Sequence, residues 1–139
     1  MHSRFSATLL VALLSAVTAI PARADFMVTP ISLPTEEQYE AVNRALPPDD
    51  RGELFRSREA DLNGDERPDL IGQFTYRCSQ TGCKSFALLA TVSGYAAHTI
   101  SLPTFVDSVT VLDTVHRGMR DLRFDDARYV YHWDGKAYR

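Results

Sequence analysis

Hydrophobic and polar positions follow a helical pattern early in the chain and an alternating pattern afterwards. Residues 35–38 form a capping-box sequence that begins at Thr35. Tyr39, Val42 and Leu46 follow at near-helical spacing, and Pro47 comes directly after them. Because proline cannot continue a helix, we predict a single helix that ends at this point.

After this helix the chain consists of short apolar runs separated by turn residues, which is the pattern of β-strands. The expected strands are residues 53–60, 70–76, 86–92, 95–102, 106–112, 121–124, 129–133 and 136–138. Pro103 should end the fourth strand, and the hairpin dipeptide Asp134-Gly135 should join the last two. Consecutive short strands with tight turns predict an α+β fold, with an antiparallel β-meander sheet and one N-terminal helix packed on it.

The first 24 residues have the features of a secretory leader. Residues 1–4 supply a short basic start, residues 5–20 are apolar, and residues 21–24 end in an Ala-x-Ala cleavage pattern. The apolar run is shorter than the roughly 20 residues that a membrane-spanning helix needs. We therefore expect a signal peptide at 1–24, a single domain at 25–139, and a periplasmic protein without a membrane anchor.

The charge of the chain limits the classes of partner. The formal net charge is -3, and removal of Arg4 and Arg23 with the leader takes away two positive charges, which leaves -5. An acidic protein is a poor ligand for nucleic acid or anionic membrane. A cation or a basic protein surface is a more reasonable partner.

The two cysteines are expected to form a disulfide bond. Four residues separate Cys78 from Cys83, and disulfides persist in the compartment that the leader predicts. A bridge that closes so short a loop stabilises the fold by about 2 kcal/mol. A redox or nucleophilic thiol is the alternative, but it would need a C-x-x-C spacing or a Cys/His context.

Residues 61–69 carry oxygen donors at alternate positions, as a calcium loop does. The expected ligands are Asp61, Asn63, Asp65 and Asp69 at loop positions 1, 3, 5 and 9, with the backbone carbonyl of Arg67 at position 7. A plain turn without a cation is the alternative, because Asp, Asn and Gly are turn formers in their own right.

This loop differs from an EF-hand, since Gly72 stands where the closing Glu would be and strands flank it. It resembles the D-x-[DN]-x-D-G-x-x-D calcium loops of integrin-type FG-GAP repeats. Glu66 stands where that pattern has glycine. If the position requires a left-handed backbone, Glu66 costs about 1–2 kcal/mol, and a weak Kd of roughly 10⁻⁴ to 10⁻³ M is expected.

The sequence gives little support for catalysis. His98, His116 and His132 are far apart in the chain and match no H-E-x-x-H or related motif. His132 lies between Tyr131 and Trp133 in an expected strand, where it would be a packing residue. These two aromatics and Tyr129 should lie on one face as core residues, although a sugar-binding platform is an alternative. We therefore expect a protein that is not an enzyme.

Several of these features together resemble immunity proteins of type VI secretion amidase effectors, in particular the third amidase immunity family. The shared features are the leader, the single helix, the lone calcium loop, the C-x4-C hairpin with the strand after it, and the aromatic ending at residues 129–138. The resemblance implies a periplasmic inhibitor without enzymatic activity that blocks the Cys/His active site of a peptidoglycan amidase. A calcium-assisted homodimer is one form that it implies.

The hairpin between the two cysteines is the expected contact with such a partner. Ser79, Gln80 and Thr81 form its tip and are the first candidates to enter a cleft, while the acidic surface would face a basic effector. The alternatives are a hairpin that only fastens two strands, and a stand-alone calcium-binding module that recognises a glycan or another envelope protein.

Overall fold

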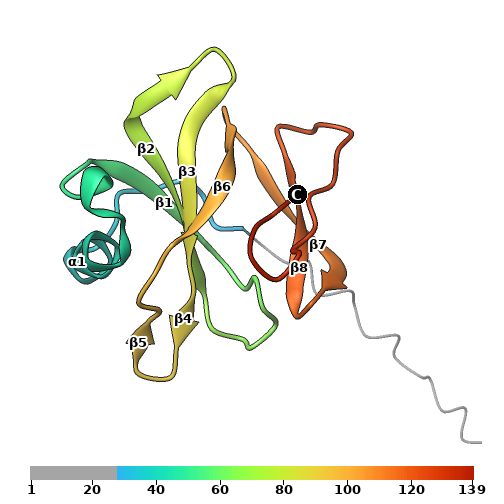
Figure 1. The fold of residues 1–139 in the computed structure, drawn as a ribbon, viewed down its shortest axis with the longest axis horizontal. Coiled ribbons are helices and arrows are strands. Elements are labelled where there is room, and N and C mark those ends of the chain that lie inside the picture. Colours follow the sequence, from blue (N-terminus) through green and yellow to red (C-terminus); the bar gives the residue numbers. More distant parts are fainter. Residues whose placement is uncertain (1–27) are drawn as a thin grey trace, which may run out of the picture.

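The computed structural model describes residues 28–139, so the predicted signal peptide lies outside the described residues. Figure 1 shows the fold. The elements in chain order are helix α1 (Glu36–Ala45), the short 3-10 helix η1 (Pro48–Asp50), and strands β1 (Phe55–Ala60), β2 (Asp69–Ser79), β3 (Gly82–Leu88), β4 (Ala90–Thr91), β5 (Gly94–Tyr95), β6 (Ile100–Phe105), β7 (Val109–His116) and β8 (Met119–Phe124).

Helix α1 begins and ends where the sequence predicts. The Thr35 hydroxyl accepts a hydrogen bond from the Gln38 backbone N–H at 3.2 Å, and the Gln38 side chain accepts one from the Thr35 N–H at 2.9 Å. Leu46 is extended, directly before the prolines. Among residues 28–139, no helix is long and apolar enough to cross a membrane.

Strands β1, β2, β3 and β6 form one antiparallel sheet in that order, which confirms the predicted α+β fold and its meander. Strands β7 and β8 form a separate hairpin, and β4 pairs with β5 in a second small hairpin. In Figure 1, α1 and the β7–β8 hairpin lie on opposite sides of this sheet.

The sheet separates two hydrophobic clusters, because alternate residues of a strand point to opposite faces. On the helix face, Leu70 and Phe74 of β2 pack in a cluster with Val42 of α1. On the other face, Ile71 packs in a cluster with Leu122 of β8. The helix and the hairpin therefore each cover one face of the sheet.

Strand β2 loses its regular register halfway along. It pairs with β3 from Leu70 to Gln73, and the pairing resumes only at Cys78 after an irregular stretch. Within this irregular stretch the strand leaves the core, and Tyr76 is 74% exposed. Residues 76–81 of the β2–β3 hairpin are thus exposed, whereas Gly82 on the returning strand packs against Phe105.

Several predicted strand boundaries are wrong. Strand β3 begins at Gly82 instead of residue 86, and β7 covers Val109–His116 instead of 106–112. The expected strand at 95–102 is divided between β5 and β6, and β6 continues through Pro103. A proline is tolerated there because β6 is an edge strand of the sheet, where one side needs no ladder hydrogen bonds.

The predicted strands at 129–133 and 136–138 are reduced to isolated bridges. Leu122 pairs with Tyr131, and Trp133 pairs with Tyr138 across the predicted Asp134-Gly135 turn. Tyr131 and Trp133 pack partly buried against the core, as expected, but Tyr129 is 78% exposed and is not a core residue.

Candidate functional site

The 61–69 loop is held closed by its own side chains. One Asp61 carboxylate oxygen accepts the Gly64 N–H at 2.8 Å, and the other accepts the Glu66 N–H at 2.9 Å. Both donors belong to residues with left-handed backbone, with φ of 74° at Gly64 and 65° at Glu66. Glu66 therefore occupies the conformation that favours glycine.

The next two donors turn inward in the same way, and an arginine already interacts with one of them. The Asn63 side-chain oxygen accepts the Asp65 N–H at 3.2 Å, and Asp65 accepts the Arg67 N–H at 2.9 Å. This bond to the Arg67 backbone is the main reason that the pKa of Asp65 lies below its ordinary value. The Arg67 guanidinium lies 3.1 Å from the second Asp65 oxygen, so a cation would compete with it there.

Asp69 anchors the loop to the sheet. The side chain is fully buried, and its two oxygens accept the N–H groups of Leu62 and Ala90, both at 2.7 Å. Burial raises the pKa of Asp69 to about 6, and the negative charges of Asp65 and Asp61 contribute to the rise. A bound cation would offset this unfavourable charge.

The donor set of the loop suits calcium in its chemistry, since it offers carboxylate, amide and backbone carbonyl oxygens. However, among the described residues the carboxylate oxygens of Asp61, Asp65 and Asp69 do not come within 4.8 Å of one another as a group. Calcium would be held by Asp61, Asn63, Asp65, Asp69 and the Arg67 carbonyl only after the loop tightens further.

Gly72 has a packing role that explains why no closing Glu stands there. It lies opposite Phe86 in the β2–β3 pair, and a Cβ atom at this position would lie 2.1 Å from the Phe86 ring. The ring therefore occupies the space that any side chain would need.

The disulfide predicted between Cys78 and Cys83 is confirmed. It crosses the β2–β3 hairpin just before the tip, where Ser79, Gln80 and Thr81 are all exposed. The hydroxyls of Ser79 and Thr81 share a hydrogen bond of 3.0 Å. The predicted contact residues thus lie together on a covalently closed turn.

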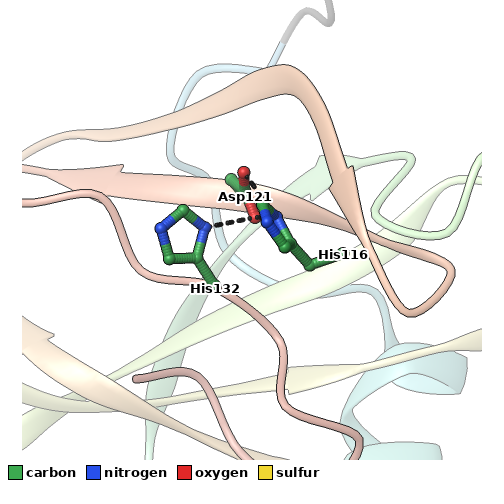
Figure 2. Close-up of side chains that lie close together, drawn as sticks. All are labelled: His116, Asp121 and His132. Atoms are coloured by element: carbon green, nitrogen blue, oxygen red, sulfur yellow. Dashed lines mark hydrogen bonds and ion pairs between the residues drawn. The ribbon is translucent and has the colours of Figure 1, made fainter.

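A second cluster, which the sequence did not predict, joins His116, Asp121 and His132 (Figure 2). The Nδ1 atom of His116 lies 2.8 Å from Asp121 Oδ1, and that of His132 lies 3.0 Å from the same oxygen. The two imidazole centroids are 4.3 Å apart. The prediction that His132 is a packing residue is wrong, because its side chain is 50% exposed and contacts Asp121.

Three segments of the chain position this cluster. His116 is the last residue of β7 and pairs with Met119 of β8, two residues before Asp121. His132 belongs to the C-terminal segment, where its N–H and C=O bond to Arg139 at 2.8 and 2.9 Å. The hairpin and the returning C-terminus therefore bring the three side chains together.

Asp121 is ionised at neutral pH although it is almost fully buried, with 1% of its surface exposed. Burial favours its neutral form, but hydrogen bonds from Thr114, His132 and His116 outweigh burial and hold the pKa of Asp121 below its ordinary value. Hydrogen bonds from these three side chains thus stabilise a buried carboxylate.

The proximity of His116 to Asp121 could have been predicted from the sequence. His116 and Asp121 flank a tight turn in which Arg117 and Gly118 both have positive φ, and a hairpin there places them on neighbouring strands. His132 gave no such signal, because its position depends on isolated bridges rather than on a regular strand.

No protein-family model, curated protein or solved structure matches this chain. The resemblance to amidase immunity proteins therefore stays a prediction that rests on short motifs.

Proposed function

We propose that this protein is an exported inhibitor without enzymatic activity, which binds and blocks a peptidoglycan amidase effector in the periplasm. The observation that carries the proposal is the tip of the β2–β3 hairpin. This tip projects beyond the rest of the sheet in Figure 1, and residues 76–81 are exposed. A narrow projection of this shape suits insertion into an active-site cleft.

The tip is also restrained before any partner binds. The Cys78–Cys83 bond closes the hairpin, and the Arg77 guanidinium lies 2.8 Å from the Glu53 carboxylate outside the sheet. A segment that is already ordered loses little conformational entropy on binding, which favours affinity. Rigidity at Ser79, Gln80 and Thr81 therefore supports their assignment as contact residues.

Calcium would stabilise this scaffold rather than touch the partner. The 61–69 loop joins β1 to the start of β2 at Asp69, whereas the tip follows the end of β2 at Ser79. Ten residue steps along an extended strand span roughly 30 Å. Calcium and the disulfide would then fasten opposite ends of the same strand.

The charge of the protein fits a basic effector. The predicted mature chain has a net charge of -5, because the total of -3 includes Arg4 and Arg23 of the leader. Opposite charges accelerate association and help to exclude wrong partners. The proposal therefore predicts that binding weakens as salt rises.

The test is inhibition of a purified Cys/His peptidoglycan amidase from the same strain by the mature protein, with peptidoglycan hydrolysis as the readout. We expect Gln80→Lys to weaken inhibition and binding at least tenfold. Val92→Lys is the matched control, because Val92 is 86% exposed in the β4–β5 turn at the other end of the sheet.

Other outcomes of this experiment would contradict the proposal or favour the alternative. Unchanged inhibition by Gln80→Lys and Gln80→Ala would remove the tip as the contact. Retention on peptidoglycan that EDTA abolishes, without any amidase inhibition, would favour the stand-alone calcium module. Hydrolysis of peptidoglycan by the protein itself would contradict both roles.

Light scattering of the protein with calcium and with EDTA tests the calcium-assisted homodimer.

A further inference from the structure

We infer that His116, Asp121 and His132 form a metal site for a divalent transition cation of the Zn²⁺ class, separate from the calcium loop. The ligand atoms are Nδ1 of both histidines and Oδ1 of Asp121, and all three side chains offer an atom within 4.8 Å of the others. This site does not depend on the proposed inhibitor function.

The spacing of these atoms is close to that of a zinc centre. Both Nδ1 atoms approach the same Asp121 oxygen, at 2.8 and 3.0 Å. Tetrahedral zinc with bonds of about 2.0–2.1 Å holds neighbouring ligand atoms roughly 3.3 Å apart. Metal binding therefore needs each Nδ1 atom to move away from Asp121 Oδ1 by only a few tenths of an ångström, as the cation takes the place of the hydrogen bonds.

The donor types select the class of cation. Two imidazole nitrogens and one carboxylate oxygen suit Zn²⁺ and its neighbours, whereas calcium takes oxygen ligands almost alone. The 61–69 loop offers oxygen atoms only. The 61–69 loop should consequently prefer a hard cation such as Ca²⁺, and the His116–Asp121–His132 cluster should prefer a borderline cation such as Zn²⁺.

The surroundings of Asp121 resemble the support that metal ligands receive. The Thr114 hydroxyl donates to Oδ2, which also lies 3.0 Å from His116 Nδ1, and Oδ1 is directed at both rings. Partners of this kind orient a ligand and tune its affinity for metal.

The site is reachable from solvent and has room for a further ligand. The side chains of His116 and His132 are 51% and 50% exposed. Three protein ligands leave one tetrahedral position, which a water molecule or an acidic group of a partner could take. Figure 2 shows His132 approaching Asp121 from the C-terminal segment.

Because the ligands come from three segments, the metal would fasten the C-terminus to the β7–β8 hairpin. The segment after Tyr129 is attached to β8 through the isolated bridge between Tyr131 and Leu122 and the hydrogen bond from the Tyr138 hydroxyl to the Arg120 carbonyl. A cation that binds only the folded arrangement stabilises it by mass action. Zinc should therefore slow hydrogen exchange at residues 129–139 more than at α1.

The test uses the mature protein after removal of metals with EDTA, titrated with ZnCl₂ by calorimetry and with CoCl₂ by absorption spectroscopy. We expect one Zn²⁺ per chain, and d–d absorption bands of Co²⁺ with a nitrogen ligand set. His116→Ala and His132→Ala should each weaken binding about tenfold or more. His98→Ala is the matched control, since His98 is an exposed histidine outside the cluster.

Circular dichroism checks that each variant is folded, and His132→Gln provides a more conservative second variant. Absence of Zn²⁺ binding at millimolar concentration would overturn the inference and leave the cluster as a hydrogen-bonded network. Equal loss of affinity in His98→Ala, or displacement of Zn²⁺ by a modest excess of Ca²⁺, would overturn it as well.

Discussion

Glu66 shows most clearly how one residue can limit a site. Its φ of 65° is the left-handed conformation, which costs a residue with a Cβ atom about 1–2 kcal/mol. The Glu66 N–H nevertheless bonds to Asp61 at 2.9 Å, so the loop closes in spite of this strain. The strain is part of the reason to expect a weak calcium site.

Glu66→Gly should therefore raise the free energy of unfolding by about 1 kcal/mol and tighten calcium binding. The measurements are urea denaturation and calorimetric titration with CaCl₂. Glu66→Ala is the control, because it removes the carboxylate but keeps the Cβ atom, and it should give little of the gain. An equal gain in both variants would show that the side-chain charge, and not the backbone, limits the loop.

At the scale of single residues, the sequence predicted what local spacing determines. Oxygen donors at Asp61, Asn63 and Asp65 turn inward as their alternation indicates. The complete burial of Asp69 was not predictable, because one of its hydrogen bonds comes from Ala90, which lies 21 residues further along the chain. The contact of His132 with Asp121 was not predictable for the same reason, because the two residues lie in different segments of the chain.

At the scale of elements, Asp125 is the residue that joins the end of β8 to the loop between β6 and β7. Its carboxylate accepts the N–H groups of Val106 and Asp107, both at 2.7 Å, and that of Ser108 at 3.0 Å. Partial burial favours the neutral acid, but these three bonds and the nearby charge of Arg58 outweigh it and lower the pKa of Asp125.

Asp125→Asn should destabilise the fold by roughly 0.5–1 kcal/mol at neutral pH, because one charged acceptor is lost at an exposed position where solvent screens its charge. The pKa of Asp125 is lower in the folded state than in the unfolded state. The stabilisation is therefore present above the ordinary value of 3.8 and is lost as the pH falls through the folded pKa. Urea denaturation at a series of pH values should show the two proteins converging in acid.

The exposed neighbour Asp126 supplies the control, since Asp126→Asn changes the charge in the same way without removing these three bonds. A constant difference between wild type and Asp125→Asn down to the lowest pH would contradict an electrostatic role for Asp125.

Elements with strong local signals were predicted well, and those that depend on tertiary contacts were not. The capping box and Pro47 determine α1, so its position could be predicted from a few residues. The division at 95–102 and the path of β6 through Pro103 depend on which strand lies at the edge of the sheet. The C-terminal segment does not form the two predicted strands, because its described residues pair with the β8 backbone only at the bridge between Tyr131 and Leu122.

At the scale of the whole molecule, the backbone of Arg120 connects the 61–69 loop with the C-terminus. Its N–H donates to the Leu62 carbonyl at 2.7 Å, and its carbonyl accepts the Tyr138 hydroxyl at 3.0 Å. Burial raises the pKa of Tyr138, and the charges of Asp121 and Asp69 add to this effect. The negative charge of Asp69 in the loop therefore affects the pKa of Tyr138 near the C-terminus.

Calcium should accordingly stabilise the entire fold and not the loop alone. At calcium concentrations ten to one hundred times the Kd, mass action raises the free energy of unfolding by about 1.4–2.7 kcal/mol. Urea denaturation followed by circular dichroism, in millimolar CaCl₂ and in EDTA, measures this shift. Asp65→Asn should lose most of it, whereas His132→Ala should keep it, because His132 belongs to the other cluster. Superimposed curves for the wild type in CaCl₂ and in EDTA would reduce residues 61–69 to an acidic turn.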